Sequence, residues 1–517
     1  MKKILLAFVL LFPATFCFGQ KTIIYVEKAH KADYNTTLGK DIQRLIGDVV
    51  IRHDSTLFYC DSAYLNEVTK NFDAFSNVHI NVNDSVDIYS DKLRYTGKTR
   101  VAELFDNVRL VDDSTTLYTE YLIYYRNLNL ANYPNEGLII SGDKHLKSKK
   151  GYYRADLKEF YFRQDVVMSS PKDTLYTDTL VYNNRTEIAT IVGPSIIRAD
   201  NNTIYGNYGW YNTVSDRFFL NKRATIVGLE QSMSSDSVYY DRMIGFGESM
   251  GNVEIKDTVN QIILTGHYAQ MWEEIGKSFV TDSAIATTYD NVDTLFLHAD
   301  TLFMYFDKDH NAKEMFAYQS VRFFRTDLQG VCDSLIYTMI DTTIRMRKDP
   351  VLWSNGNQLS ADSIDIAIRN QQVDSMTMYN AAFIIVRDTI EGFNQVKGKN
   401  MVAFFHDNDL YLVNADGNSQ TVYWMREDDG NLIGVNFAES STMSINVDKN
   451  QIAGIRYFSA PKEVTIPEKD LGTVEKELKG FIWRDAIRPT DKHDIFRHIE
   501  KQVEGDSSSR KTKNRKE

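Results

Sequence analysis

A tyrosine recurs at a fixed interval along the first half of the chain and limits the folds that this sequence can adopt. Tyrosines stand at positions 95, 124, 153, 182, 211 and 240, each 29 residues after the one before. In the clearest copy, Ser90-Asp91-Lys92-Leu93-Arg94-Tyr95, an aliphatic residue follows the aspartate at the second position and the tyrosine at the fourth. A fixed period of 20 to 50 residues is typical of stacked repeat architectures. We therefore expect a repeat array.

Short alternating runs indicate that the repeats are built from strands. Segments such as Asn77-Val78-His79-Ile80 and Asn107-Val108-Arg109-Leu110 precede the frame aspartate by about twelve residues and alternate with period two. Turn clusters such as Asp112-Asp113-Ser114 follow them, and a third short strand is expected over residues 101–105. With little helical periodicity, the prediction is an all-β, elongated solenoid with repeats of about 29–33 residues.

The spacing of the frame divides the chain. Up to position 236 the steps are 29 or 30 residues, and beyond it they vary from 29 to 37. We therefore expect a regular module over residues 20–270, a less regular module over 271–405 and a β-meander over 406–466. Residues 467–517 are expected to form an extension, with a short helix within 474–482, and a disordered tail rich in Ser and Lys.

The first nineteen residues have the pattern of an export signal. Lys2 and Lys3 precede an apolar run over residues 4–12, and Cys17-Phe18-Gly19 places small residues at a cleavage site before Gln20. No later apolar run approaches the eighteen residues that a membrane-spanning helix needs. The mature protein is therefore expected to be exported.

Charge and composition argue against nucleic acid, metal and catalysis. The net charge of −11 gives no electrostatic reason to bind phosphate backbones. The ten histidines have no metal-ligand spacing, so no metal or cofactor is expected. The frame aspartate is replaced by Lys149 and Lys399 in two repeats, which favours a role in turn or bend geometry over an enzymatic one. Cys60 and Cys332 are expected to be free thiols.

Two columns of apolar residues face the interior of the predicted array. One column is the residue two positions after the frame aspartate, which is uncharged in every repeat. The other consists of the alternating apolar residues of the preceding strand, such as Val78 and Ile80. These columns fill a dry core or line an open groove, in which each buried methylene of an alkyl chain contributes about 0.8 kcal/mol. The candidate groove residues are Leu93, Leu122, Leu180, Val238, Leu302, Leu335, Ile364, Val78, Ile80, Val108, Leu110, Val166 and Val253.

The repeated units, after an export signal, resemble the OstA-like family, which includes the LptA-type periplasmic proteins of lipopolysaccharide transport. The resemblance covers roughly residues 40–405 and implies an open β-jelly roll, or β-taco. It also implies that the protein carries lipopolysaccharide or a related glycolipid by its acyl chains, between inner-membrane and outer-membrane components of the transport machinery. A periplasmic location, in association with the outer membrane, is implied as well. End-to-end self-association through terminal strands is a further expectation.

Two other functions remain open on the sequence. One is a structural or adhesive β-solenoid with a closed core and no lipid ligand. The other is a parallel β-helix enzyme acting on polysaccharide, which would need carboxylates and basic residues clustered on one exposed face. The interrupted aspartate column and the lack of any repeat that concentrates such groups argue against the enzyme.

Overall fold

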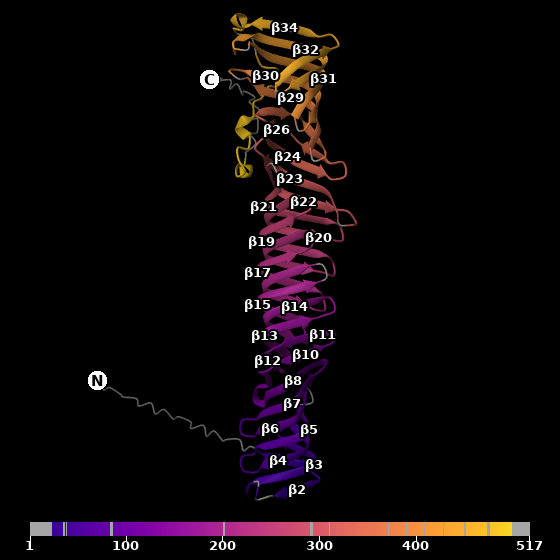
Figure 1. The fold of residues 1–517 in the computed structure, drawn as a ribbon, viewed down its shortest axis with the longest axis vertical. Coiled ribbons are helices and arrows are strands. Elements are labelled where there is room, and N and C mark those ends of the chain that lie inside the picture. Colours follow the sequence, from indigo (N-terminus) through magenta and orange to yellow (C-terminus); the bar gives the residue numbers. More distant parts are fainter. Residues whose placement is uncertain are drawn as a thin grey trace, which may run out of the picture. The chain divides into compact units, whose positions relative to one another are not determined.

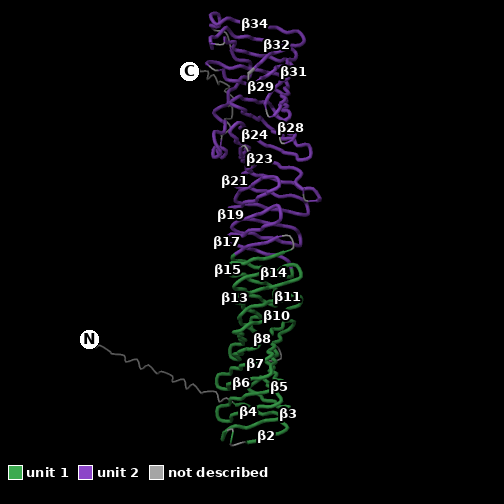
Figure 2. Tube along the Cα trace, viewed as in Figure 1, with its two compact units in different colours: residues 1–200, 207–214 green, residues 201–206, 215–517 purple. Residues whose placement is uncertain are grey.

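The computed structural model describes most of the chain and divides it into two compact units. It describes residues 23–34, 37, 39–82, 86–199, 202–289, 293–309, 311–370, 372–388, 390–407, 409–427, 429–448, 451–472 and 476–498. The expected export signal and the expected disordered tail therefore lie outside the described residues. Unit 1 comprises residues 1–200 and 207–214, and unit 2 comprises residues 201–206 and 215–517 (Figure 2).

Unit 1 is built from antiparallel strands that follow one another in chain order (Figure 1). Most of these strands have 11 or 12 residues. The elements are β1 (Ile24–Lys28), β2 (Lys31–Tyr34), β3 (Ile42–His53), β4 (Thr56–Asn66), β5 (Phe72–Val82), β6 (Val86–Thr96), β7 (Val101–Asp112), β8 (Thr115–Tyr125), η1 (Arg126–Leu128), β9 (Leu130–Tyr133), β10 (Gly137–Ser141), β11 (Lys144–Ser148), β12 (Lys150–Arg154), β13 (Glu159–Ser169), β14 (Asp173–Asn183) and β15 (Ile188–Ala199).

Unit 2 continues with strands of the same kind, after β16 (Thr203–Asn212), which has residues in both units. The elements are β17 (Arg217–Val227), β18 (Gln231–Asp241), β19 (Phe246–Asp257), β20 (Ile262–Trp272), β21 (Lys277–Tyr289), β22 (Thr294–Phe306), β23 (Ala312–Phe324), β24 (Leu328–Thr338), β25 (Thr343–Arg347), β26 (Val351–Ser354), β27 (Asn357–Ser360), β28 (Ser363–Arg369), β29 (Gln372–Arg387), β30 (Phe393–His406), β31 (Asp409–Arg426), β32 (Leu432–Asp448), β33 (Gln451–Phe458), β34 (Lys462–Pro467), η2 (Glu468–Asp470), η3 (Asp485–Ile487) and η4 (Asp494–Phe496).

Each long strand changes direction near its middle, where the pairing register shifts, and in alternate long strands residues at this point have left-handed φ angles. In β7 the bend falls at Asp106 and Asn107, whose φ angles of 63° and 52° lie in the left-handed region. The register between β6 and β7 shifts at this point. The residues on one side of the bends pair in one half-sheet, called A, which in β7 holds residues 101–105. The residues on the other side pair in half-sheet B, which in β7 holds residues 108–112.

This bend corrects one prediction and confirms another. The expected third short strand over 101–105 and the run beginning at Asn107 are two parts of the single strand β7. The 29-residue repeat is therefore one hairpin of two bent strands, and frame tyrosines stand on alternate strands. The all-β prediction is confirmed: the only helices among the described residues are short 3-10 turns. The expected helix within 474–482 is wrong for the part described, since residues 476–482 are not helical.

The frame aspartates hold the bends, as their expected geometric role requires. Asp91 accepts a hydrogen bond of 2.7 Å from the Nδ2 atom of Asn107, at the bend of the next strand. The pairs Asp61–Asn77 and Asp236–Asn252 repeat this contact at 2.9 and 2.8 Å. Where the frame residue is Lys149, the bend carries Asp165 instead of asparagine, and the two form an ion pair of 2.5 Å.

The two half-sheets of unit 1 face each other across an apolar interior. Alternate residues of each strand point inward and are buried. Contact between the half-sheets is direct, since the ring of Phe58 in half-sheet B lies 4.8 Å from that of Tyr95 in half-sheet A. Cys60 and Cys332 are free and buried, as predicted, and burial raises the pKa of each thiol to about 12.

Replacement of a bend asparagine tests the bend. Asn107→Ala removes the hydrogen bond to Asp91 and places an alanine at a left-handed φ, so it should lower the free energy of unfolding by about 2 kcal/mol. Asn107→Gly loses the same hydrogen bond but tolerates the left-handed φ, so its cost should be about 1 kcal/mol. Denaturant unfolding measures both. Equal losses in the two variants would show that the left-handed backbone is not strained.

Candidate functional site

The interior of each unit is the candidate site, and all thirteen predicted groove residues lie on its walls. Each is at most 4% exposed. The residues that follow the frame aspartate belong to half-sheet A, and those of the preceding strand belong to half-sheet B. On wall A lie Leu93, Leu122, Leu180, Val238, Leu302, Leu335 and Ile364, and on wall B lie Val78, Ile80, Val108, Leu110, Val166 and Val253. Whether they contact lipid stays a prediction.

Large side chains fill the interior of unit 1. Eleven of the twelve largest fully buried side chains belong to this unit, and eight of the eleven are aromatic. They are Tyr95, Tyr124, Tyr133, Tyr153, Tyr182, Phe58, Phe160, Phe162, Leu45, Ile51 and Ile80. The frame tyrosines in this group are therefore packed core residues.

Charged turns close the interior of unit 1 along the edge opposite the bends. There the turns of half-sheet A meet those of half-sheet B, and we call this edge the seam. The Arg100 guanidinium lies 2.9 Å from the Asp54 carboxylate, and Lys144 lies 3.0 Å from Glu187. In each pair one residue comes from an A turn and the other from a B turn. These pairs, together with Lys158 and the buried Asp112, form what we call the latch.

Tyrosine hydroxyls continue the latch inward. The Tyr95 hydroxyl is 2.6 Å from the Nδ1 atom of His53 and accepts a hydrogen bond of 2.8 Å from Arg126. The Tyr153 hydroxyl donates to the fully buried Asp112, which also pairs with Lys158. A buried carboxylate is tolerated only with such partners. The seam of unit 1 is therefore closed by ion pairs and hydrogen bonds lying over an aromatic core.

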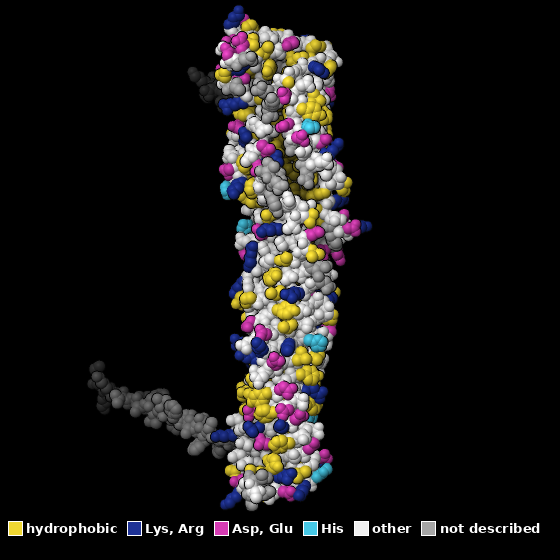
Figure 3. Space-filling view, in the orientation of Figure 1, with side chains coloured by type: hydrophobic (Ala, Val, Ile, Leu, Met, Phe, Trp, Pro, Cys, Tyr) yellow, Lys and Arg dark blue, Asp and Glu magenta, His cyan; other side chains and the backbone are white. Residues whose placement is uncertain are grey.

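The seam of unit 2 is different, because aliphatic side chains of both half-sheets stand at its edge only half-buried. Ile255, Leu264 and Leu295 do so in half-sheet B, and Met271 of half-sheet A is 37% exposed. Among the described residues, polar contacts at its turns run along one row. Arg217 with Asp241 joins two A turns, for example. On the face drawn in Figure 3, positive and negative side chains are interspersed over the surface.

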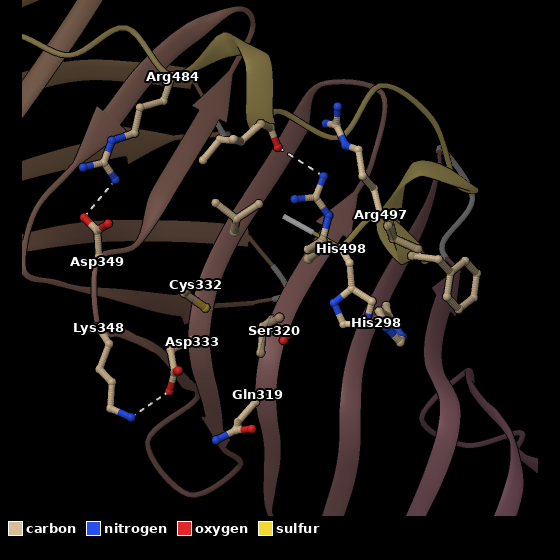
Figure 4. A pocket seen from close by; sticks show the side chains of 16 residues that line it. His298, Gln319, Ser320, Cys332, Asp333, Lys348, Asp349, Arg484, Arg497 and His498 are labelled. Carbon is tan, nitrogen blue, oxygen red and sulfur yellow. Dashed lines mark hydrogen bonds and ion pairs between the residues drawn. The ribbon is translucent and has the colours of Figure 1, made fainter. Parts of the chain in front are cut away.

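A hollow of about 700 Å³ in unit 2 lies beside the C-terminal segment 476–498. Figure 4 shows that its charges are already engaged: Lys348 pairs with Asp333, and Arg484 with Asp349, each at 2.8 Å. Arg322 donates a 3.1 Å hydrogen bond to the carbonyl of Ile487. Burial, and the nearby Arg497 charge, lower the pKa of Arg322 to about 10. The contacts of Arg484 and Arg322 fasten the C-terminal segment 476–498 to the strands, and we call this segment the strap.

Buried glutamines bind the main chain of the strap. The Gln358 amide donates to the carbonyl of Ile482 and accepts from the N–H of Arg484, at 2.8 and 2.7 Å. Gln395 contacts the strap in the same way. Its side-chain amide donates to the carbonyl of Lys476 and accepts from the N–H of Leu478, both at 2.8 Å. Apolar contacts add to these, since strap residue Ile487 packs on a cluster of Val331, Val351 and Trp353.

The sequence analysis found the apolar walls but neither the latch nor the strap. Latch partners are 43 and 46 residues apart in the pairs Lys144–Glu187 and Lys158–Asp112. One signal for the strap was present: Gln329, Gln358 and Gln395 each stand four residues before a frame position. Among the described residues no group of three or more His, Cys, Asp or Glu is placed to hold a metal, and no helix is long and apolar enough to span a membrane.

Acid should weaken the latch through His53. Burial and the Arg126 charge lower the pKa of this histidine to about 4 in the folded protein. The unfolded chain takes up the proton near pH 6.5, so folding stability falls as the pH drops from 6.5 towards 4. Between pH 7.5 and 4.5 we expect His53 to account for a loss of about 2.5 kcal/mol. Denaturant unfolding of wild type and His53→Gln should show a smaller loss in the variant; equal losses would refute this role.

Gln358→Leu should release the strap locally. The substitution leaves one carbonyl and one N–H of the strap without partners, at a cost of about 1–3 kcal/mol. Hydrogen exchange should become faster over residues 476–488 and stay unchanged in β3–β8. Gln372→Leu, at an exposed glutamine of the same unit, is the matched control. Unchanged exchange in the strap of the Gln358 variant would contradict the assignment.

Comparison with known proteins gives one family match. The model of a family described as OstA-like protein matches residues 21–178 and 163–236. No curated protein matches the chain. A similar solved structure is that of LptH from Pseudomonas aeruginosa, described as the LptA homologous periplasmic component of the conserved lipopolysaccharide transport device. It is 12% identical, with 22% of this chain and 80% of that chain covered and a TM-score of 0.19. Over residues 21–236, the chain is therefore similar to the OstA-like family.

Proposed function

We propose that the protein is an exported periplasmic carrier that holds lipopolysaccharide or a related glycolipid by its acyl chains on the way to the outer membrane. The observation that carries this proposal is the uncharged interior between two half-sheets, to which both predicted columns contribute. An interior of this kind can take up alkyl chains without any bond-making step. The OstA-like match supports the same function.

The partners follow from this role. A carrier must receive its lipid from inner-membrane components and deliver it to outer-membrane components of a lipid-transport machinery. End-to-end association of copies is part of the proposal, because terminal strands offer main-chain groups for pairing. In unit 2, β34 pairs with β32, and its residues are exposed apart from Ile466, which is half-buried.

A structural solenoid with a closed core is the second candidate, and one observation favours it for part of the chain. The interior of unit 1 is filled with aromatic rings and closed by the latch. A closed core has no room for a ligand unless the packing changes.

Lipid analysis of the natively purified protein tests the carrier function. The full chain is expressed in a cell that makes lipopolysaccharide, purified without detergent and extracted for mass spectrometry. We expect an acylated glycolipid to co-purify, and a fluorescently labelled lipopolysaccharide to bind to the lipid-free protein. Absence of glycolipid from the extract, together with no binding of the labelled probe, would refute the carrier function.

A further inference from the structure

We propose that the acyl chains bind between the half-sheets of unit 2, along β19 to β24, and that the interior of unit 1 is a dry core. This inference rests on the proposed carrier function and names the part of the interior that performs it. Most of the region that matches the OstA-like family lies in unit 1. The binding segment, residues 246–338, would therefore lie entirely beyond the matched residues.

Half-buried aliphatic side chains form the edge of the unit 2 interior. Ile255 and Leu264 stand opposite each other in register on neighbouring strands, and both are half-buried. Met271 and Met315, on half-sheet A, extend the same apolar edge. Unbranched methionine side chains adjust to guests of varying shape. Lipid chains vary in length and bending, so an edge of flexible aliphatic side chains suits them.

Small side chains form the floor beneath this edge. Ala284 and Ala299 are paired on adjacent strands, and Ala286 lies between Leu264 and Leu297. Five alanines of this stretch point inward and are buried: Ala269, Ala284, Ala286, Ala299 and Ala317. In unit 1, phenylalanine and tyrosine rings occupy much of the corresponding interior. The interior of unit 2 can thus admit a chain when edge side chains move, without displacing large rings.

Entry into unit 1 would require much more rearrangement. A chain crossing its seam must separate Arg100 from Asp54 and expose Asp112, which is fully buried. It must also displace rings such as Tyr95, which is fully buried and bonded to His53. Leaving buried charged and polar groups without partners is strongly unfavourable. Of the predicted groove residues, Val253, Leu302 and Leu335 therefore belong to the binding stretch, whereas Leu93, Leu122 and Leu180 are core residues.

Site-specific photocrosslinking tests the division. A diazirine-bearing amino acid is placed at Leu264 or Leu295 in unit 2 and at Leu110 or Leu122 in unit 1, in the full chain. The probe is lipopolysaccharide with a fluorescent label on its sugar. We expect at least tenfold more labelled adduct from the unit 2 positions than from the unit 1 positions. Ile244, 55% exposed at a turn of unit 2, sets the background.

The other outcomes separate the two proposals. Adducts from unit 1 that equal or exceed those from unit 2 would overturn the division while leaving the carrier function intact. Binding of the labelled probe without adducts above background at any interior position would also overturn it. No co-purifying glycolipid and no probe binding would overturn the carrier function itself.

A matched pair of alanine substitutions gives a second readout that does not depend on crosslinking. Ala286→Leu adds bulk to the floor of unit 2 and should lower the affinity for labelled lipopolysaccharide about tenfold, with a small change in unfolding temperature. Ala102→Leu adds the same bulk to the closed interior of unit 1, where the alanine is fully buried. It should lower the unfolding temperature but leave the affinity of the folded protein unchanged. The reverse pattern would overturn the division.

Discussion

The bend near the middle of the long strands, where alternate strands carry residues at left-handed φ angles, is the constraint on which the rest of the structure depends. Without it the strands would form a flat antiparallel sheet, and its apolar face would have nothing to pack against. The bend places residues such as Asp106 and Asn107 at left-handed φ angles, which cost about 1–2 kcal/mol for most side chains. Asparagine and aspartate tolerate this region best after glycine. The hydrogen bond from Asn107 to Asp91 then fixes the bend to the preceding strand.

Once a sheet is folded over in this way, its two rows of turns approach each other and their side chains decide whether the interior is closed. In unit 1 charges of opposite sign face each other, and Asp112 is fully buried because Lys158 and Tyr153 satisfy it. In unit 2 the edge carries half-buried aliphatic residues such as Ile255 and Leu264. One backbone plan thus yields an interior edged by ion pairs in unit 1 and by half-buried aliphatic side chains in unit 2, according to a few positions per repeat.

The sequence predicted the strands and the walls because both depend on local, periodic information. The alternation around Leu93 and Val78 is enough to place both residues in the interior. Bends and hairpin turns were not distinguished, since Asp106-Asn107 and Asp112-Asp113 carry the same turn residues and differ only in how their neighbours pair. The latch could not be predicted from the sequence, because only the stacking of the strands brings its partners together. The strap left a signal in the sequence, because its glutamines recur four residues before a frame position.

The swap at Lys149 shows what selection on such a repeat must preserve. An aspartate column interrupted by lysine excludes a catalytic or metal-binding row, yet the bend survives because Asp165 reverses the charges of the pair. In these repeats the frame residue keeps a contact with the next bend, whichever side of the pair carries the negative charge. This contact does not limit the size of the interior side chains, which ranges from tyrosine in unit 1 to alanine in unit 2. A closed solenoid in unit 1 is therefore compatible with the lipid groove that we propose for unit 2.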